Sequence, residues 1–459
     1  MAHDLSFITA EMMVLIAGAG ALVFEMLRRP RAALIFAIAA LLVATGLSWP
    51  LLGLNLGIFG NTFRIDTLSV WAKLILLPTT ILALLLARAE LAGTDREGTV
   101  YSLLCFTTFG ALVLAGSGDT MFLVLGVLLS SLGAFALVAY PRDDAATEAA
   151  MKFFVFASVT GGVMIFGLTY WFGGTGSTLL TDLGRLDKTP LAAALGLVAV
   201  ITGLGYKASL APFHFWAPDA YQGAPISVAA YLSVVPKIGA LFALAQVVRD
   251  LPTTTGWPLV VAAVAVLTMT WGYLAALAQD NIVRLLAYSS IAQAGYFLLG
   301  IVAIGISPLA ITSLVVFAAA YAAMNLGAFA IVQGTGRTIH DFSGVGRTHP
   351  LTSIAMTIFL LSLVGIPPLA GFAGKFLLFG AAIDAHFTWL AVVAILNSVV
   401  SLAVYLRIIV PMYRSDENAD STPAPADRNP FMVRIVWLVA LFVTIGLGLS
   451  AQLILNTIG

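Results

Sequence analysis

Residues 364–382, VGIPPLAGFAGKFLLFGAA, place two adjacent prolines inside a hydrophobic segment long enough to cross a membrane. A second stretch, residues 207–225 with the sequence KASLAPFHFWAPDAYQGAP, places three prolines and a histidine in a similar setting. Proline breaks a helix by removing a backbone hydrogen bond, and lipid tolerates the freed groups only where protein or water satisfies them. We therefore expect two discontinuous transmembrane helices, at 190–222 and 351–383, each with a lysine close to its break.

The rest of the chain has the composition of a polytopic membrane protein. Of its 459 residues, 60% are hydrophobic and only 10% are charged, whereas roughly 25% are charged in a soluble domain. A spanning helix needs about 20 apolar residues. We predict an all-α polytopic membrane protein that forms a single membrane domain over 1–459. About fourteen transmembrane helices are expected, at 8–27, 32–53, 69–90, 100–116, 119–140, 149–172, 190–222, 225–249, 257–278, 283–305, 309–334, 351–383, 387–413 and 431–456.

The two expected breaks lie five helices apart, which suggests an internal repeat. Helices 4–8, at 100–250, and helices 9–13, at 257–413, would each contain one broken helix. Because five is odd, the second unit enters the membrane from the opposite side, so the repeats are inverted. Matching broken helices in inverted repeats indicate a transport path near the midplane, although proline and glycine are also common in membrane helices generally. Outside the repeats we expect three N-terminal helices over 1–99, a cytoplasmic linker over 414–430 and a last helix over 431–459.

Lysine has an unusual distribution in this chain. Five of the six lysines fall inside hydrophobic segments, whereas most of the sixteen arginines fall in loops. A charge within lipid costs roughly 2.5–3.5 kcal/mol, and a desolvated lysine, unlike arginine, can release its proton. We therefore interpret Lys207, Lys237 and Lys375 as proton-transfer groups. Lys152 could equally be a lysine that reaches the membrane surface, and for Lys73 that interpretation is favoured.

Further polar residues accompany these lysines. His214, at the first break, could relay a proton near neutral pH or be a buried structural histidine. Ser289, Ser290 and Gln293 could anchor a water chain between the lysines, although hydroxyls in membrane helices usually serve packing. Helices 4–8 hold no carboxylate in mid-membrane, so Glu11 of the first helix or a neighbouring subunit could supply a counter-charge.

Several classes of site are excluded by the sequence. The single cysteine, Cys105, rules out a disulfide framework and a cysteine-ligated cluster. There is no dinucleotide fingerprint, P-loop or haem attachment motif. We expect no cofactor, no metal and no direct NADH binding in this chain, so that any electron chemistry belongs to a partner. No basic cluster is interleaved with aromatic residues, so nucleic acid is not an expected partner.

The basic residues predict the orientation of the chain. With the N-terminus outside, twelve fall on the cytoplasmic side and four on the outer side, so both termini are expected on the outer, periplasmic side. The first residues, MAHDLSF, lack the features of a cleaved signal peptide, and we expect the first helix to remain as an anchor. The cytoplasmic set is Arg28, Arg29, Arg31, Arg88, Arg96, Arg142, Arg284, Arg337, Arg347, Arg414, Arg428 and Arg434; the outer set is Arg64, Arg185, Lys188 and Arg249.

Three stretches carry a family resemblance. Residues 204–241, LGYKASLAPFHFWAPDAYQGAPISVAAYLSVVPKIGAL, together with 279–296 and 363–413, resemble the antiporter-like subunits of respiratory complex I, and within them subunit N of the bacterial NADH:quinone oxidoreductase most closely. The resemblance extends over nearly the whole chain. It implies fourteen helices with inverted repeats, in the bacterial inner membrane, beside other membrane-arm subunits including sister antiporter-like subunits.

The resemblance also implies a function. The chain would be a proton-translocating, non-redox subunit that couples quinone reduction elsewhere in the complex to proton transfer. In the family pattern the proton path runs through lysines that match Lys152, Lys207 and Lys237, while Lys375 serves the other half-channel. His214 matches a histidine of the family.

Two positions depart from the family pattern. A glutamate is expected where the run LGVLLSSL has Leu128, and a histidine is frequent where this chain has Gln293. Both changes replace a titratable group with a neutral one. Two alternatives therefore stay open: a structural complex I subunit whose own channel is lost or altered, and a subunit of an Mrp-type cation/proton antiporter.

Overall fold

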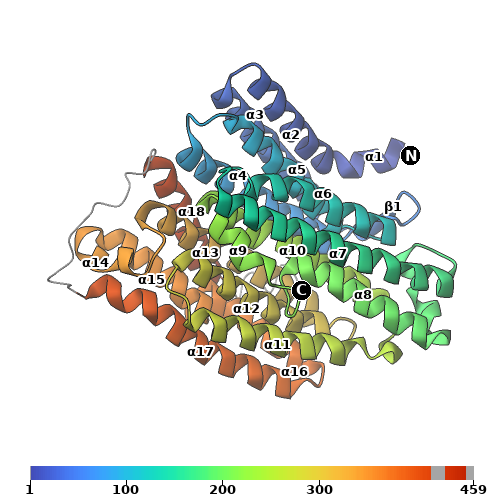
Figure 1. Ribbon diagram of the computed structural model, residues 1–459. Helices are drawn as coiled ribbons and strands as arrows, with labels where there is room; N and C mark the ends of the chain where they lie inside the picture. The colour runs from blue at the N-terminus through green and yellow to red at the C-terminus, as the bar shows by residue number, and fades with distance from the viewer. Residues whose placement is uncertain (1, 415–429, 451–459) are drawn as a thin grey trace.

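The computed structural model describes residues 2–414 and 430–450 as an assembly of helices that run roughly side by side (Figure 1). Within these two ranges, five short 3-10 helices and one hairpin accompany eighteen α-helices. The α-helices are α1 Ala2–Leu5, α2 Thr9–Met26, α3 Pro30–Ser48, α4 Thr67–Leu91, α5 Glu97–Ala115, α6 Thr120–Val138, α7 Asp144–Thr175, α8 Pro190–Ala208, α9 Trp216–Gly223, α10 Ile226–Asp250, α11 Trp257–Leu277, α12 Ile282–Val302, α13 Leu309–Thr335, α14 Val345–Thr348, α15 Pro350–Val364, α16 Ala370–Asp384, α17 Thr388–Tyr413 and α18 Pro430–Leu449. The 3-10 helices are η1 Ser6–Ile8, η2 Trp49–Leu51, η3 Leu180–Lys188, η4 Thr253–Thr255 and η5 His340–Phe342; the strands are β1 Leu56–Ile58 and β2 Phe63–Ile65.

The predicted all-helical polytopic fold is confirmed. Among the described residues, thirteen helices are long and apolar enough to cross a membrane. The difference from the expected fourteen arises at 351–383, because this segment divides into α15 and α16, each of 15 residues. The predicted linker at 414–430 falls almost entirely outside the described residues, as does the end of the last helix beyond residue 450. The division into inverted repeats stays a prediction.

One element was not expected. Strands β1 and β2 pair antiparallel in the connection between α3 and α4, with Leu56 opposite Ile65 and Ile58 opposite Phe63. The turn between them has positive φ at Phe59, Gly60 and Asn61. Strands of three residues are too short to leave a periodic signal in the sequence.

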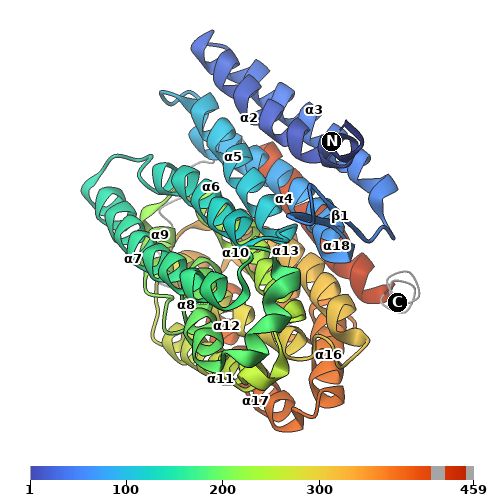
Figure 2. The same cartoon turned by 90° about the vertical axis from the view of Figure 1, so that its right-hand side faces the viewer.

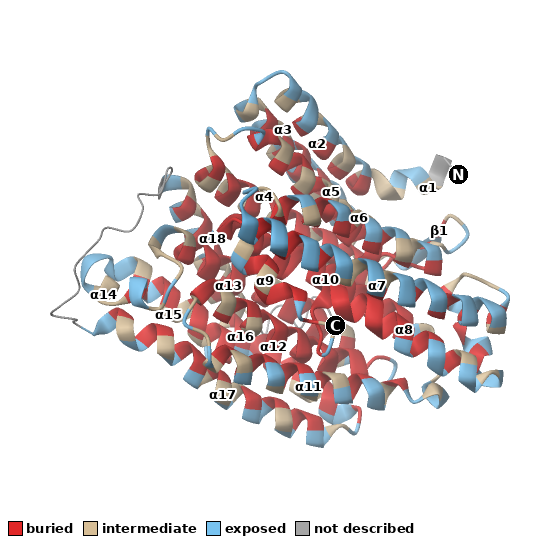
Figure 3. Ribbon diagram, in the orientation of Figure 1, coloured by how far each residue is buried: buried red, intermediate tan, exposed pale blue. Residues whose placement is uncertain are grey.

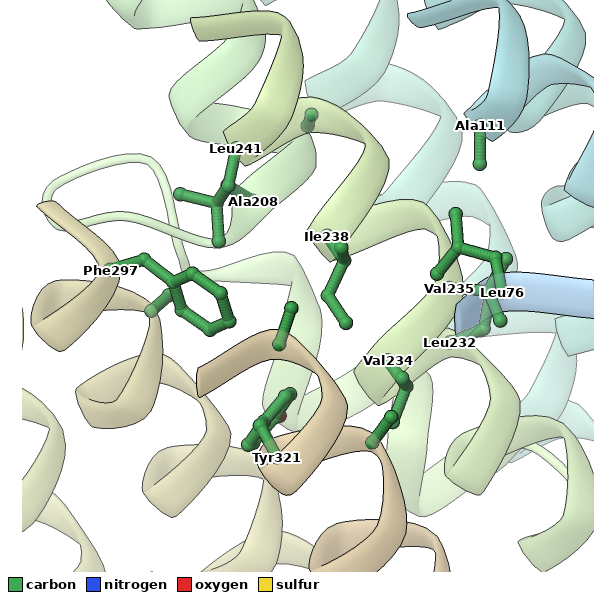
Figure 4. Packing of buried hydrophobic residues seen from close by; sticks show 14 of the residues in the cluster. Leu76, Ala111, Ala208, Leu232, Val234, Val235, Ile238, Leu241, Phe297 and Tyr321 are labelled. Carbon is green, nitrogen blue, oxygen red and sulfur yellow. The ribbon is translucent and has the colours of Figure 1, made fainter. Parts of the chain in front are cut away.

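Helix α10 occupies the centre of the molecule. Every residue of α10 from Ile226 to Val248 is buried, and 94% of the most apolar 18-residue stretch is buried in both α12 and α13. All three helices are almost entirely red in Figure 3, whereas α2, α7 and α17 carry pale blue outer faces. Figure 4 shows Ile238 and Val235 of α10 between Leu76 and Ala111 on one side and Phe297 and Tyr321 on the other. A side chain on α10 therefore meets protein on every face.

The flanking helices close the bundle around this core. Helices α2 and α3 lie together at one edge and pack against α5 and α4 (Figures 1 and 2). The last helix, α18, contacts α4, α13 and α16, and Figure 2 shows it between α4 and α16. The C-terminal helix thereby joins the N-terminal helices to the second half of the chain.

Both expected helix breaks are present, and their backbone groups have partners. Helix α8 ends at Ala208, followed by Ser209 in the left-handed region, and α9 begins at Trp216. The indole of Trp216 donates to the Tyr206 carbonyl at 2.8 Å, and Ala211 N donates to Thr268 Oγ1 at 3.1 Å. Such internal satisfaction is what permits irregular backbone at membrane depth. The second break runs from Gly365, with φ +96°, to the start of α16.

Candidate functional site

Lys375 lies directly at the second break. Its Nζ donates to the carbonyls of Leu363 and Val364, at 2.9 and 3.0 Å, and to Ser398 Oγ of α17 at 3.3 Å. The centroid of the Tyr296 ring lies 3.9 Å from the same nitrogen. Carbonyls at the end of a helix have no intrahelical donor and carry partial negative charge, so the end of α15 can hold an ammonium group without a carboxylate.

Lys237 lies at the centre of the bundle on α10. Its Nζ donates to the carbonyl of Ser290 at 3.0 Å and to the hydroxyl of the same residue, on α12, at 2.8 Å. The side chain is 1% exposed. Because α10 is covered on all sides, this lysine cannot extend its ammonium group to the membrane surface.

Lys207 lies at the end of α8, next to the first break. It is buried, and its Nζ donates to Ser130 O and Ser131 Oγ of α6, both at 2.9 Å. Leu128, the position assigned to the missing family acid, is 50% exposed. Lys207 is therefore contacted by the side chain of Ser131, which lies one helical turn beyond Leu128. A residue at position 128 lies on the exposed side of α6.

These three lysines share one property. Among the residues that the structure describes, none of them forms an ion pair with a carboxylate. Lys152 and Lys73, in contrast, both do. The three deep lysines thus donate hydrogen bonds only to neutral oxygen atoms. For Lys207 and Lys237 this agrees with the absence of mid-membrane acids from the predicted helices 4–8.

A chain of polar groups leads from Lys237 to Lys375. Lys237 bonds Ser290, and the neighbouring Ser289 hydroxyl lies 2.5 Å from the hydroxyl of Tyr405. Gln293 Nε2 approaches Tyr405 at 3.4 Å and donates to the Leu363 carbonyl at 2.9 Å. That carbonyl is also an acceptor for Lys375. The three polar residues expected between the lysines are therefore brought together there, with one gap between the adjacent serine side chains.

Lys152 and His214 lie away from this chain. Lys152 of α7 is half-exposed and pairs with Glu148 at 2.7 Å and with Asp219 at 3.0 Å, and Asp219 also binds Arg284 at 2.7 Å. His214 is buried, with its ring 4.5 Å from the ring of Phe215, and its Nδ1 has no hydrogen-bond partner among the described residues. Among the described residues, no hydrogen bond or ion pair joins His214 to any of the lysines.

One buried pair was missed by sequence reasoning. Lys73 of α4 is 1% exposed and lies 2.8 Å from the carboxylate of Glu11 on α2. The expectation that Lys73 extends its head group to the membrane surface is therefore wrong, because the side chain is buried and Glu11 supplies a counter-charge. For the same reason Glu11 is not the replacement acid for Lys207. The sequence feature that could have predicted this pair is the position of the two residues, because Glu11 and Lys73 each lie near the start of their predicted helix and so on the same side of the membrane.

The position of Ser130 and Ser131 depends on a close helix approach. A Cβ added at Gly110 of α5 would lie 2.3 Å from Ser130 N. Gly110→Ala is therefore expected to push α6 away and to lower the free energy of unfolding by about 1–3 kcal/mol, measured as thermal unfolding in mild detergent. Gly162→Ala on α7 is the control, since nothing lies within 4 Å of its added Cβ. Equal stability of the two variants would contradict the tight α5–α6 contact.

Fold and site together define a class of protein: a polytopic, antiporter-like membrane protein with buried lysines beside two helix breaks. A family model described as NADH:quinone oxidoreductase/Mrp antiporter, TM, matches residues 117–401. The chain belongs to this NADH:quinone oxidoreductase/Mrp antiporter transmembrane family.

Individual relatives agree with this assignment. NADH-quinone oxidoreductase subunit N of Mycobacterium sp. (strain JLS) is 39% identical over 383 residues, 82% of each chain. Subunit N of Heliobacterium modesticaldum is 35% identical over 462 residues, covering 97% of this chain and 96% of the relative. A chain of respiratory complex I from Thermus thermophilus superposes with a TM-score of 0.84 at 28% identity, over 97% of this chain and 98% of that one.

Proposed function

We propose that this chain is a proton-translocating membrane-arm subunit of an NADH:quinone oxidoreductase. The observation that carries the proposal is the polar chain from Lys237 to Lys375, in which each buried ammonium donates hydrogen bonds only to neutral oxygen atoms. The names of its relatives, as subunit N, support the choice of enzyme complex. The partners are other membrane-arm subunits, including sister antiporter-like chains.

The proposed mechanism is a change of protonation state at fixed lysines. An ammonium in a low-dielectric interior responds strongly to nearby charge, so a lysine releases its proton when a positive charge approaches and regains it when that charge leaves. Lys207, Lys237 and Lys375 would carry the protons. Water would bridge the gaps between them, with Ser289, Ser290 and Gln293 as anchors. Quinone reduction elsewhere in the complex would supply the change of charge, and this chain would take no part in electron transfer.

The arrangement of the chain in the membrane is part of the proposal. Inverted repeats at 100–250 and 257–413 would place the breaks of α8–α9 and α15–α16 at matching positions, with the helices of 1–99 and 431–459 outside them. The distribution of arginine supports outer, periplasmic termini in a bacterial inner membrane. Lys152 and His214 would act, if at all, at the edge of the path, since one is half-exposed and the other contacts neither neighbouring lysine.

The two other functions are less well supported. A structural subunit without its own channel would not need three buried lysines, each of which costs free energy to bury. An Mrp-type antiporter subunit shares the family, but both sequence relatives named above are subunit N chains.

The neutral residues on α6 allow a test of an altered channel. A carboxylate introduced as Ser131→Glu would lie against Lys207 and favour its ammonium form, so proton release should slow by about tenfold. Leu128→Glu is the matched variant, because that side chain lies on the exposed face of the same helix; it should leave the number of protons pumped per electron unchanged. For both variants, the rate of proton pumping and the number of protons pumped per electron are measured from NADH-driven acidification of membrane vesicles. If Leu128→Glu slowed pumping more than Ser131→Glu, the contact between Ser131 and Lys207 would be contradicted.

Membership in the complex is tested by affinity purification in mild detergent followed by mass spectrometry. The proposal predicts flavin and iron–sulfur subunits together with sister antiporter-like chains. A set of small membrane subunits without any redox protein would instead identify a cation/proton antiporter and would overturn the respiratory assignment.

A further inference from the structure

Each of the three deep lysines is held by one serine hydroxyl and by at least one backbone carbonyl. Lys207 contacts Ser131 Oγ and a carbonyl of α6, and Lys237 contacts Ser290 Oγ and the carbonyl of the same residue. Lys375 contacts Ser398 Oγ and two carbonyls at the end of α15. The same combination therefore recurs on three different helices.

A lysine that gains and loses a proton inside a protein has a specific hydrogen-bonding problem. The ammonium form has three N–H donors and no acceptor, whereas the amine form has two donors and one lone pair that needs a donor. A backbone carbonyl can only accept, and a carboxylate can only accept while it is ionised. A serine hydroxyl can do either, because its O–H group rotates. It can therefore satisfy both forms without movement of the backbone.

The site of Lys375 fits this requirement atom for atom. In the ammonium form, its three N–H groups have three acceptors: Leu363 O, Val364 O and Ser398 Oγ. In the amine form, the two carbonyls accept both remaining N–H groups, and the Ser398 O–H turns to donate to Nζ. The Tyr296 hydroxyl lies 2.8 Å from Ser398 Oγ and donates to the Ala394 carbonyl at 3.0 Å, so it can accept from Ser398 in the ammonium form and keeps its own acceptor in the amine form.

No charged group competes with this serine. The titratable side chain that faces Lys375 directly is Tyr296, whose ring lies against Nζ, and Gln293 links the site to Tyr273 and Tyr405. Asp384 lies nine residues further along α16 and accepts from Ser307 at 2.8 Å. Among the described residues, no acidic side chain forms an ion pair with Lys375.

We propose that Ser131, Ser290 and Ser398 are positioning residues whose hydroxyls reverse their hydrogen-bond direction as Lys207, Lys237 and Lys375 change protonation state. This proposal deepens the proposed function and rests on it, since it requires that the lysines exchange protons. It separates the two kinds of acceptor: the carbonyls hold the lysine in place, and the serine accommodates the change.

The test uses three substitutions of Ser398 in the whole complex, in vesicles energised with NADH. Ser398→Thr keeps a hydroxyl that can donate and accept, Ser398→Ala removes it, and Ser398→Asp supplies a group that in its ionised form only accepts. Ser401→Ala is the matched control, because Ser401 lies one turn further along α17 and bonds the Ser398 carbonyl rather than a lysine. The readout is the initial rate of proton pumping, together with NADH oxidation in the presence of an uncoupler.

We expect Ser398→Thr and Ser401→Ala to pump within about twofold of the natural chain. Ser398→Ala and Ser398→Asp should both be slower, by about tenfold. Alanine removes one hydrogen-bond partner from both forms of the lysine, and an ionised aspartate leaves the lone pair of the amine without a donor. An aspartate variant that pumps at the natural rate would show that the site needs only an acceptor and would overturn the inference. If the aspartate variant does not assemble, the alanine and threonine variants decide alone, and equal rates for those two would overturn it.

Failure of this inference can be told apart from failure of the proposed function. If Lys375→Met pumps normally, the lysine carries no protons and the proposed function itself is wrong. If Lys375→Met is inactive while all serine variants pump normally, only the role of the serines is contradicted.

Discussion

Lys375→Met is expected to lower the initial rate of NADH-driven proton pumping by at least about tenfold. Methionine has a similar length but no charge, so no proton can be held at the end of α15. The carbonyls of Leu363 and Val364 would also lose the donor that they have at 2.9 and 3.0 Å. The rate is measured as quenching of a pH-sensitive dye in membrane vesicles, normalised to the amount of assembled complex.

Two further variants make this result specific. Lys375→Arg keeps the positive charge but, because arginine does not release its proton, it should pump as slowly as the methionine variant. Lys188→Met removes an exposed lysine at the end of η3 and should pump like the natural chain. Normal pumping by Lys375→Arg would mean that the charge of this residue matters but its proton does not.

Loss of one partner of the Glu11–Lys73 pair is expected to have the largest effect on stability. Glu11→Gln or Lys73→Met alone should lower the free energy of unfolding by about 3–5 kcal/mol, because each leaves a buried charge without a partner. The double variant should recover most of that loss, since it removes both charges together. Unfolding of the purified chain in mild detergent measures all three.

The control for this cycle is a lysine of the same chain that is not buried. Lys152→Met also removes an ion pair, but Lys152 is half-exposed, so solvent screens its charge. The free energy of unfolding of this variant should therefore equal that of the natural chain. If the double variant instead lost as much free energy of unfolding as the two single variants together, Glu11 and Lys73 would stabilise the fold independently and would not act as a pair.

The features predicted most accurately from the sequence were those that local chemistry dictates. Proline cannot continue a helix, so the breaks after Ala208 and Val364 could be located from Pro212 and from the pair Pro367 and Pro368. The depth of Lys237 also followed from the sequence, because twelve uncharged residues precede it within the predicted segment 225–249.

The contacts that were missed are those made between segments far apart in the chain. Nothing in the sequence states that Glu11 and Lys73 face each other, since the approach depends on how α2 and α4 each pack against α3 and α5. The contact between Ser131 and Lys207 could not be predicted for a related reason: Leu128 is only one turn away, and the rotation of α6 about its axis decides which of the two residues is buried. The proton-transfer roles of the site residues stay predictions.

The most direct test of proton translocation through this chain is the number of protons pumped per electron by the complex that carries Lys237→Met. The ratio separates proton transfer from a general slowing of the enzyme, and Lys237 lies where no other described cation can replace it. We expect the ratio to fall by the share that this chain carries, while NADH still reduces quinone. An unchanged ratio in a fully assembled complex would show that the protons take another route.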